Sequence, residues 1–93
     1  MLRDRPPVLT TESDKDVDTY IGCLNPKLVA IRPPVQLMRD GNAAILRITS
    51  FANPVLVVTV SPRAGGGSDI QLRARISGAK GVAASVEAAN ACR

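Results

Sequence analysis

Alternating hydrophobic and polar residues run through the second half of the chain and predict β-strands there. Residues 70–76 place an apolar side chain at every second position, which is typical of a strand with one face in a core and one in water. Residues 43–49 alternate in the same way. Residues 55–60 form a β-branched run with a single leucine, which is typical of a strand that is central in its sheet or covered on both faces. Residues 35–39 predict a fourth strand on weaker grounds, because two prolines precede them and proline is tolerated only at strand starts or edges.

The segments between these runs predict tight reversals of the chain. Asp40-Gly41-Asn42 is a hairpin signal, because Gly and Asn accept a positive φ at low cost. Residues 50–54 are long enough for a second reversal, and residues 64–69 contain three consecutive glycines, which suit a flexible hairpin tip. Short links favour an antiparallel meander, since a parallel pair needs a crossover of a dozen or more residues.

A hydrophobic stripe before the strands predicts a first helix. Its apolar side chains recur at helical spacing, at Val17, Tyr20, Ile21 and Leu24. Ser13 and Asp16 resemble a capping box in which Asp replaces Glu. We expect Pro26 to end this helix near Leu24 or Asn25, and residues 28–31 to form a short apolar connector.

A second helix is predicted at the C-terminal end. Residues 80–92 are rich in alanine, and Val82, Val86 and Ala89 form a narrow stripe of small side chains. Gly81 weakens the start of this helix by up to about 1 kcal/mol relative to alanine. Small side chains allow a helix to pack close to a sheet or to another helix.

The order of these elements predicts an α+β domain with the arrangement α-β-β-β-β-α. Both helices should cover the apolar face of a four-stranded antiparallel meander. Residues 1–10 contain little apolar material and are expected to form a flexible lead-in or tether, with a single domain over residues 11–93.

Two cysteines lie at the ends of the two predicted helices. If both helices cover one sheet face, Cys23 and Cys92 can meet and form a disulfide. In the chain-entropy model, closing a loop of this length stabilises the fold by about 4 kcal/mol. A disulfide indicates an oxidising compartment such as a periplasm or an extracellular space. The alternative is two unrelated cytosolic thiols, with Cys23 a small core residue.

The net charge of +4 is unevenly distributed along the chain. Residues 1–18 hold three basic and five acidic side chains, whereas residues 19–93 hold nine basic and three acidic ones. A basic body attracts nucleic acid, acidic lipid or an acidic protein, although a well-solvated surface would look the same. No apolar run approaches the length of a membrane span, and no signal peptide is recognisable in these residues.

Most catalytic and metal-binding constellations are excluded by composition. The chain has no histidine, so Ser-His-Asp and Cys-His catalysis are ruled out, and two cysteines leave a zinc site short of ligands. Asp14, Asp16 and Asp18 are spaced like the start of a calcium loop, but its required Gly and Glu are missing. No Lys-Ser/Thr follows the glycines at 65–67, as a phosphate-binding loop requires. We therefore expect a non-enzymatic protein with neither cofactor nor metal.

Arginines on the predicted strands form the one candidate binding surface. Arg73 and Arg75, with Arg47 or Arg39 across the sheet, would give a basic row on the solvent face. The expected partner is a protein or an envelope polymer. The alternative is a small basic cytosolic module that binds nucleic acid, against which the lack of aromatic stacking platforms argues. The row could also serve only to keep the sheet face wet and unpaired.

Residues 20–24 (Tyr-Ile-Gly-Cys-Leu) and 91–93 (Ala-Cys-Arg) carry a resemblance to a known group of proteins. In its layout over residues 15–93, the chain resembles small uncharacterised proteobacterial periplasmic lipoproteins. In these, a cleaved signal and a short tether precede a helix with one Cys, a small antiparallel sheet and a last helix with a second Cys. The resemblance implies a cell-envelope location and no known activity. The lipobox cysteine is absent here, so a lipid anchor would have to precede Met1.

Overall fold

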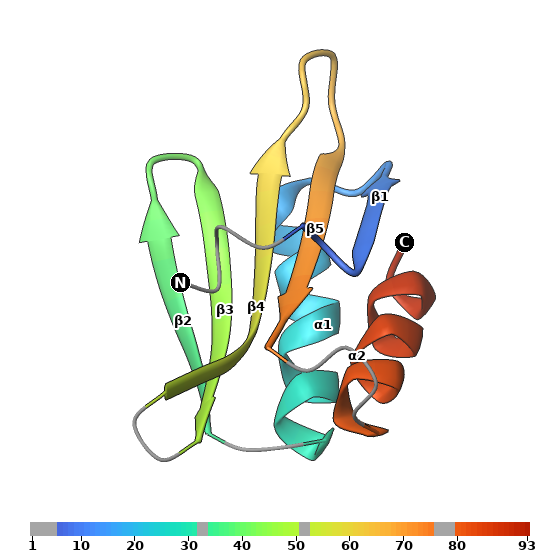
Figure 1. Ribbon diagram of the computed structural model, residues 1–93. Coiled ribbons are helices and arrows are strands. Elements are labelled where there is room, and N and C mark those ends of the chain that lie inside the picture. The colour runs from blue at the N-terminus through green and yellow to red at the C-terminus, as the bar shows by residue number, and fades with distance from the viewer. Residues whose placement is uncertain (1–5, 32–33, 51–52, 76–79) are drawn as a thin grey trace.

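The computed structural model describes residues 6–31, 34–50, 53–75 and 80–93. Figure 1 shows one antiparallel sheet with two helices against it. The elements in chain order are β1 (Leu9–Ser13), α1 (Val17–Ile31), β2 (Val35–Asp40), β3 (Ala43–Ser50), β4 (Asn53–Pro62), β5 (Ser68–Ala74) and α2 (Lys80–Ala91). The strand order across the sheet is β1-β5-β4-β3-β2. The expected α+β class, the antiparallel sheet and the two helices are thus confirmed.

The sheet has five strands, so the prediction of four was wrong. The additional strand, β1, pairs antiparallel with β5 along Leu9–Ser13, and its first two residues fall inside the segment expected to be a lead-in. Leu9 is its only aliphatic side chain, and the positions that face the helices also include Thr11 and Ser13. Because those positions are polar, the strand lacks the alternation by which strands are recognised.

The four strands after α1 form the predicted meander. Gly41 adopts a φ of +62° in the two-residue turn between β2 and β3, as the Asp-Gly-Asn signal predicts. The three glycines between β4 and β5 all have a positive φ, of 89° to 109° at Gly65 and Gly66 and 84° at Gly67. The predicted end of the last strand, Ile76, lies outside the described residues.

Helix α1 begins after Asp16, which takes the capping role expected of Ser13. The Thr19 backbone N–H donates to Oδ1 of Asp16 at 2.7 Å, which is the contact of an N-cap residue. Hydrogen bonds from the Thr19 side chain and backbone lower the pKa of the Asp16 carboxyl, because they stabilise its charged form.

Helix α1 does not end before Pro26 but continues to Ile31, so the predicted end of the helix was wrong. A proline inside a helix costs roughly 3 kcal/mol. The segment after it holds Leu28, which is fully buried, and Ile31, which packs against the core. Burying a leucine contributes about 1.5–3 kcal/mol, so these contacts offset the proline, and an extended connector would have lost them.

The hydrophobic core lies between the helices and one face of the sheet. Alternate strand residues supply its sheet side: Ala44, Leu46, Ile48, Leu56, Val58, Val60, Ile70, Leu72 and Ala74. The helices supply the other side: Val17, Tyr20, Ile21, Leu24 and Leu28 from α1, and Val82, Ala88, Ala89 and Cys92 from the α2 end. The two helices therefore share one face of the sheet, as predicted, and neither packs on the other face, which we call the open face.

Candidate functional site

The open face brings two of the four predicted arginines together. In the strand register, Arg47 on β3 and Arg73 on β5 lie opposite Val57 on β4, one on each side. Strands are spaced about 4.8 Å apart, so the two arginine backbones lie roughly two strand spacings from each other. Both arginine side chains are half-buried. Ile45 and Val57, which are also half-buried, lie on the same face beside them.

Neutral amides hold the two guanidinium groups in place. Nε and one terminal nitrogen of Arg47 donate to Oε1 of Gln36 at 3.1 and 2.7 Å. A terminal nitrogen of Arg73 donates to Oε1 of Gln71 at 2.8 Å. An amide orients a guanidinium without neutralising it, so the contact with Gln36 fixes the direction of the Arg47 group and leaves its positive charge in place.

The other two predicted arginines take different positions. Arg75 lies just past the end of β5, two residues after Arg73. It is exposed, and its backbone N–H donates to the Val55 carbonyl on β4 at 3.0 Å. Arg39 lies on β2 opposite Ala44, which places it on the helix side of the sheet, where it pairs with Asp18 at 2.7 Å. We refer to Arg47, Arg73 and Arg75 as the basic half-face.

The carboxylates of the open face lie toward the hairpin turns, at the other end of the strands. Glu12 and Asp69 are opposite each other on β1 and β5, and Arg63 pairs with both at 3.2 and 3.4 Å. Asp40 also lies at that end, beside the turn from β2 to β3. The open face is therefore divided along the strands into a basic end and an end where charges are mixed.

The predicted disulfide between Cys23 and Cys92 is confirmed. It joins α1 to the end of α2, with a Cα–Cα distance of 5.7 Å across a sequence separation of 69. Cys92 is fully buried and Cys23 is half-buried. A disulfide is compatible with an oxidising extracellular or periplasmic environment.

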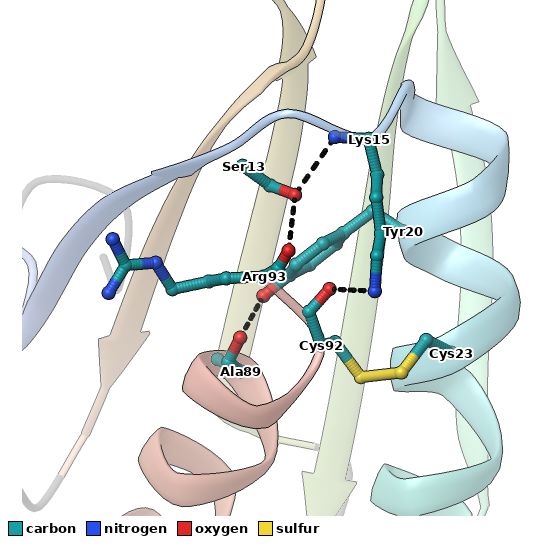
Figure 2. Close-up of a disulfide and its surroundings, with 7 residues drawn as sticks. All are labelled: Ser13, Lys15, Tyr20, Cys23, Ala89, Cys92 and Arg93. Carbon is teal, nitrogen blue, oxygen red and sulfur yellow. Dashed lines mark hydrogen bonds between the residues drawn. A yellow bond between two sulfur atoms is a disulfide. The ribbon is translucent and has the colours of Figure 1, made fainter.

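Three polar side chains from the first part of the chain bind the C-terminal end of α2 (Figure 2). The Lys15 ammonium donates to the Cys92 carbonyl at 2.8 Å, the Tyr20 hydroxyl to Ala89 at 2.7 Å, and the Ser13 hydroxyl to Arg93 at 3.3 Å. The last carbonyls of a helix lack partners inside the helix and carry partial negative charge. Helix α2 has no basic residue in its last turn, so Lys15 supplies that charge from another element.

Burial affects the ionisation of the tyrosine in this corner. It raises the pKa of Tyr20 to about 12, because the charged phenolate would lose its hydration, while the nearby Arg93 charge opposes the rise. The phenol therefore stays protonated and acts as a hydrogen-bond donor over the physiological range of pH.

Sequence reasoning missed the polar contacts of this corner. In the sequence, Tyr20 belongs to the apolar stripe of the first predicted helix, and no pattern marks Lys15. Their acceptors, at the C-terminal end of α2 and just beyond it, lie 69 and 77 residues away in the chain, and nothing in a single sequence pairs residues at such separations. The weak available signal is a lysine that directly precedes the N-cap residue of a helix, in a position where acidic residues are usual.

Neither a metal-binding cluster nor a membrane-spanning helix occurs among the described residues. No group of three or more Asp, Glu, Cys or His side chains in that part of the chain could hold a metal ion. Neither α1 nor α2 has both the length and the apolar character needed to cross a membrane, within the same residues.

The fold and the site define a small disulfide-linked α+β domain with one sheet face covered by helices and one left open by them. The chain matches no family model, no curated protein and no solved structure in the comparisons.

Proposed function

We propose that this domain is a non-enzymatic component of a bacterial cell envelope, tethered to a membrane, that binds an acidic protein through the open face. The observation that supports this most directly is the position of the helices. Both pack on one side of the sheet, and the basic half-face stands on the other side with two of its guanidinium groups held by amides.

The composition of the open face favours a protein partner over a polymer or a nucleic acid. Beside the arginines it carries Ile45 and Val57, and Met38 at its edge is 38% exposed. Protein interfaces combine an apolar centre with a polar rim and are enriched in Arg and Met. Single-stranded nucleic acid is usually bound on aromatic platforms, and the whole chain has one Tyr and one Phe.

The location in the envelope rests on the disulfide and on the resemblance to periplasmic lipoproteins. Cytosolic thiols are kept reduced, so a disulfide that joins the two helices favours export. The intact mass of the protein isolated from its own cells under thiol-blocking conditions tests this. A gain of two hydrogen masses on reduction supports the envelope, whereas two blocked thiols before reduction would contradict it.

The partner class can be tested with a synthetic peptide of alternating valine and glutamate. We expect it to bind in a salt-sensitive manner, and Arg73→Glu or Arg75→Glu to weaken binding about tenfold or more, since tenfold corresponds to 1.4 kcal/mol. Lys27→Glu, an exposed charge reversal on α1, is the matched control and should leave binding unchanged.

Three results would contradict the proposal. Unchanged peptide binding in both arginine variants would show that the basic half-face is solvated surface and does not bind the peptide. Tighter binding of dextran sulfate at equal charge would favour an envelope polymer. Tighter binding of a single-stranded DNA oligonucleotide, with a steep dependence on salt, would favour the nucleic-acid module.

A further inference from the structure

The outer edge of β2 presents backbone groups that the sheet does not use. At the two ends of the β4–β5 ladder, the Arg63 N–H donates to the Gly67 carbonyl and the Arg75 N–H to the Val55 carbonyl, so odd-numbered residues bond between these two strands. Hydrogen-bonded and non-bonded pairs alternate in an antiparallel ladder. Carried through the register to β2, this alternation directs the N–H and C=O groups of residues 36, 38 and 40 toward β3. Those of Val35, Leu37 and Arg39 point away from the sheet.

Exposed apolar side chains lie along the same edge. Leu37 and Met38 are 43% and 38% exposed, although most aliphatic side chains of β3 to β5 are buried or half-buried. Val29, 42% exposed, belongs to α1, the helix that contacts β2. A strand edge with outward backbone groups and apolar side chains on both faces is a template for another strand.

Positive charge lies beside this edge on the open face. Arg47 stands on β3, but Nε and a terminal nitrogen both donate to the side chain of Gln36 on β2, so its guanidinium is turned toward β2 and the edge of the sheet. A strand added beside β2 would lie about 4.8 Å further out. A carboxylate on that strand opposite Gln36 would come within reach of Arg47.

We propose that an extended acidic segment of the partner pairs with β2 as a sixth strand of the sheet. This inference rests on the proposed function and adds a second contact for the same partner. Because β3 and β4 separate β2 from Arg73 on β5, the bound peptide must both cross the open face and pair with β2. The outward groups of Val35, Leu37 and Arg39 supply main-chain hydrogen bonds, and Arg47 selects an acidic side chain. Strand addition of this kind takes its affinity from the main chain and its specificity from alternate side chains.

A second copy of the chain is a poorer occupant of this edge. Two β2 strands related by a two-fold axis would meet with their open faces on the same side. Each copy would then bring its Arg47 guanidinium toward the shared seam, and like charges at a seam oppose pairing. A negatively charged segment meets no such opposition.

The main-chain component is tested by Leu37→Pro, with Leu37→Ala as its matched control. Both variants remove the leucine side chain, but only proline removes the outward N–H, and that N–H takes no part in the ladder with β3. We expect Leu37→Pro to weaken binding of the valine–glutamate peptide about tenfold more than Leu37→Ala does. Equal unfolding midpoints in urea would show that both variants remain folded.

The charge component is tested by Arg47→Gln with two peptides. We expect the variant to lose affinity for the valine–glutamate peptide but not for a valine–glutamine peptide of equal length. In the wild-type complex, hydrogen exchange at the amides of Val35, Leu37 and Arg39 should slow at least tenfold, because these groups become bonded.

The outcomes separate this inference from the proposed function. If Arg73→Glu weakens binding while Leu37→Pro does not, and the three amides stay unprotected, the partner lies on the open face and strand addition is wrong. If the wild-type protein does not bind the peptide at all, both proposals fail. If the same amides are protected without peptide and light scattering reports a dimer, a second copy occupies the edge and the inference is overturned.

Discussion

The hydroxyl oxygen of Tyr20 lies 2.7 Å from the carbonyl oxygen of Ala89, so a buried hydrogen bond joins α1 to the last turn of α2. The phenol ring is fully buried, and its hydroxyl satisfies a carbonyl that the helix itself leaves without a partner. Together with the Cys23–Cys92 disulfide close by, this bond fixes the end of α2 to the rest of the core (Figure 2).

Replacing Tyr20 with Phe should therefore destabilise the fold by about 1–3 kcal/mol. The ring and its packing remain, but the Ala89 carbonyl stays buried without its donor, and an unsatisfied buried group costs about that much. Urea unfolding, monitored by far-ultraviolet circular dichroism, measures the decrease in the free energy of unfolding. A free energy of unfolding within a few tenths of a kcal/mol of wild type would show that this bond contributes nothing net.

The same residue should make stability depend on alkaline pH. The pKa of Tyr20 is about 12 in the folded protein and about 10 in an unfolded chain. Because the folded-state pKa is raised, the contribution to stability is complete below pH 10. It is lost as pH rises through 10 to 12, where the unfolded chain releases its proton first.

Comparing wild type with Tyr20→Phe isolates this effect, because the lysines titrate in both proteins. The difference in free energy of unfolding between the two should stay constant up to about pH 10 and shrink above it. A difference that does not change between pH 8 and 12 would contradict a raised pKa at Tyr20.

The disulfide should supply a large share of the total stability. Replacing both Cys23 and Cys92 with Ala frees a loop with a sequence separation of 69, which in the chain-entropy model costs about 4 kcal/mol. Domains of this size are stable by only about 5–10 kcal/mol, so the variant should unfold at a much lower urea concentration. Wild-type protein in a thiol reductant should behave in the same way. An unchanged urea midpoint in the reductant would show that the disulfide does not contribute to stability.

Local patterns of hydrophobic and turn residues predicted most strands of the sheet. They did not predict the hydrogen bonds between polar residues that are far apart in the sequence. Residues 43–49 and 70–76 were recognisable because each alternation buries one face, and the Gly41 turn because its backbone demands a positive φ. β1 is held in place by its pairing with β5 and by the bonds of Ser13 to its neighbours, and neither leaves a hydrophobic period in the sequence.

The sequence likewise predicts one part of the candidate site and misses another. The alternation along β3 and β5 placed Arg47 and Arg73 on a common face, because period-two patterns fix which face a side chain takes. The amides that hold these groups, and the turn of Arg47 toward β2, depend on rotamers and on neighbouring strands. They became visible only with the side chains in place.

Replacing Pro26 with Ala should stabilise the protein by about 1–2 kcal/mol. Proline costs a helix interior roughly 3 kcal/mol, and its restriction of the unfolded chain returns up to about 1 kcal/mol. Pro26 is exposed, so the change removes little packing. Lys27→Ala, at the next exposed position, is the control and should change stability by less than about 0.5 kcal/mol. A Pro26→Ala protein no more stable than wild type would mean that the helix is already relaxed around the ring.

Glycine is needed at position 67 for two reasons, and only one of them applies at position 65. Both residues have a left-handed backbone, with φ of +84° and +89°. A Cβ at Gly67 would also collide with the backbone carbonyl oxygen of Ser13, where β1 ends, whereas a Cβ at Gly65 meets nothing within 4 Å. Gly67→Ala must therefore push β1 away from the hairpin, and Gly65→Ala need not.

We expect Gly65→Ala to cost about 1–2 kcal/mol, the usual penalty for a left-handed residue with a side chain. Gly67→Ala should cost clearly more, and it should speed hydrogen exchange at β1 amides that bond to β5, such as that of Thr11. Urea unfolding and exchange measured on both variants decide the point. If both substitutions lower the free energy of unfolding equally and the β1 amides exchange slowly in both variants, the hairpin adjusts without disturbing β1. The Ser13 carbonyl then does not fix the position of the hairpin.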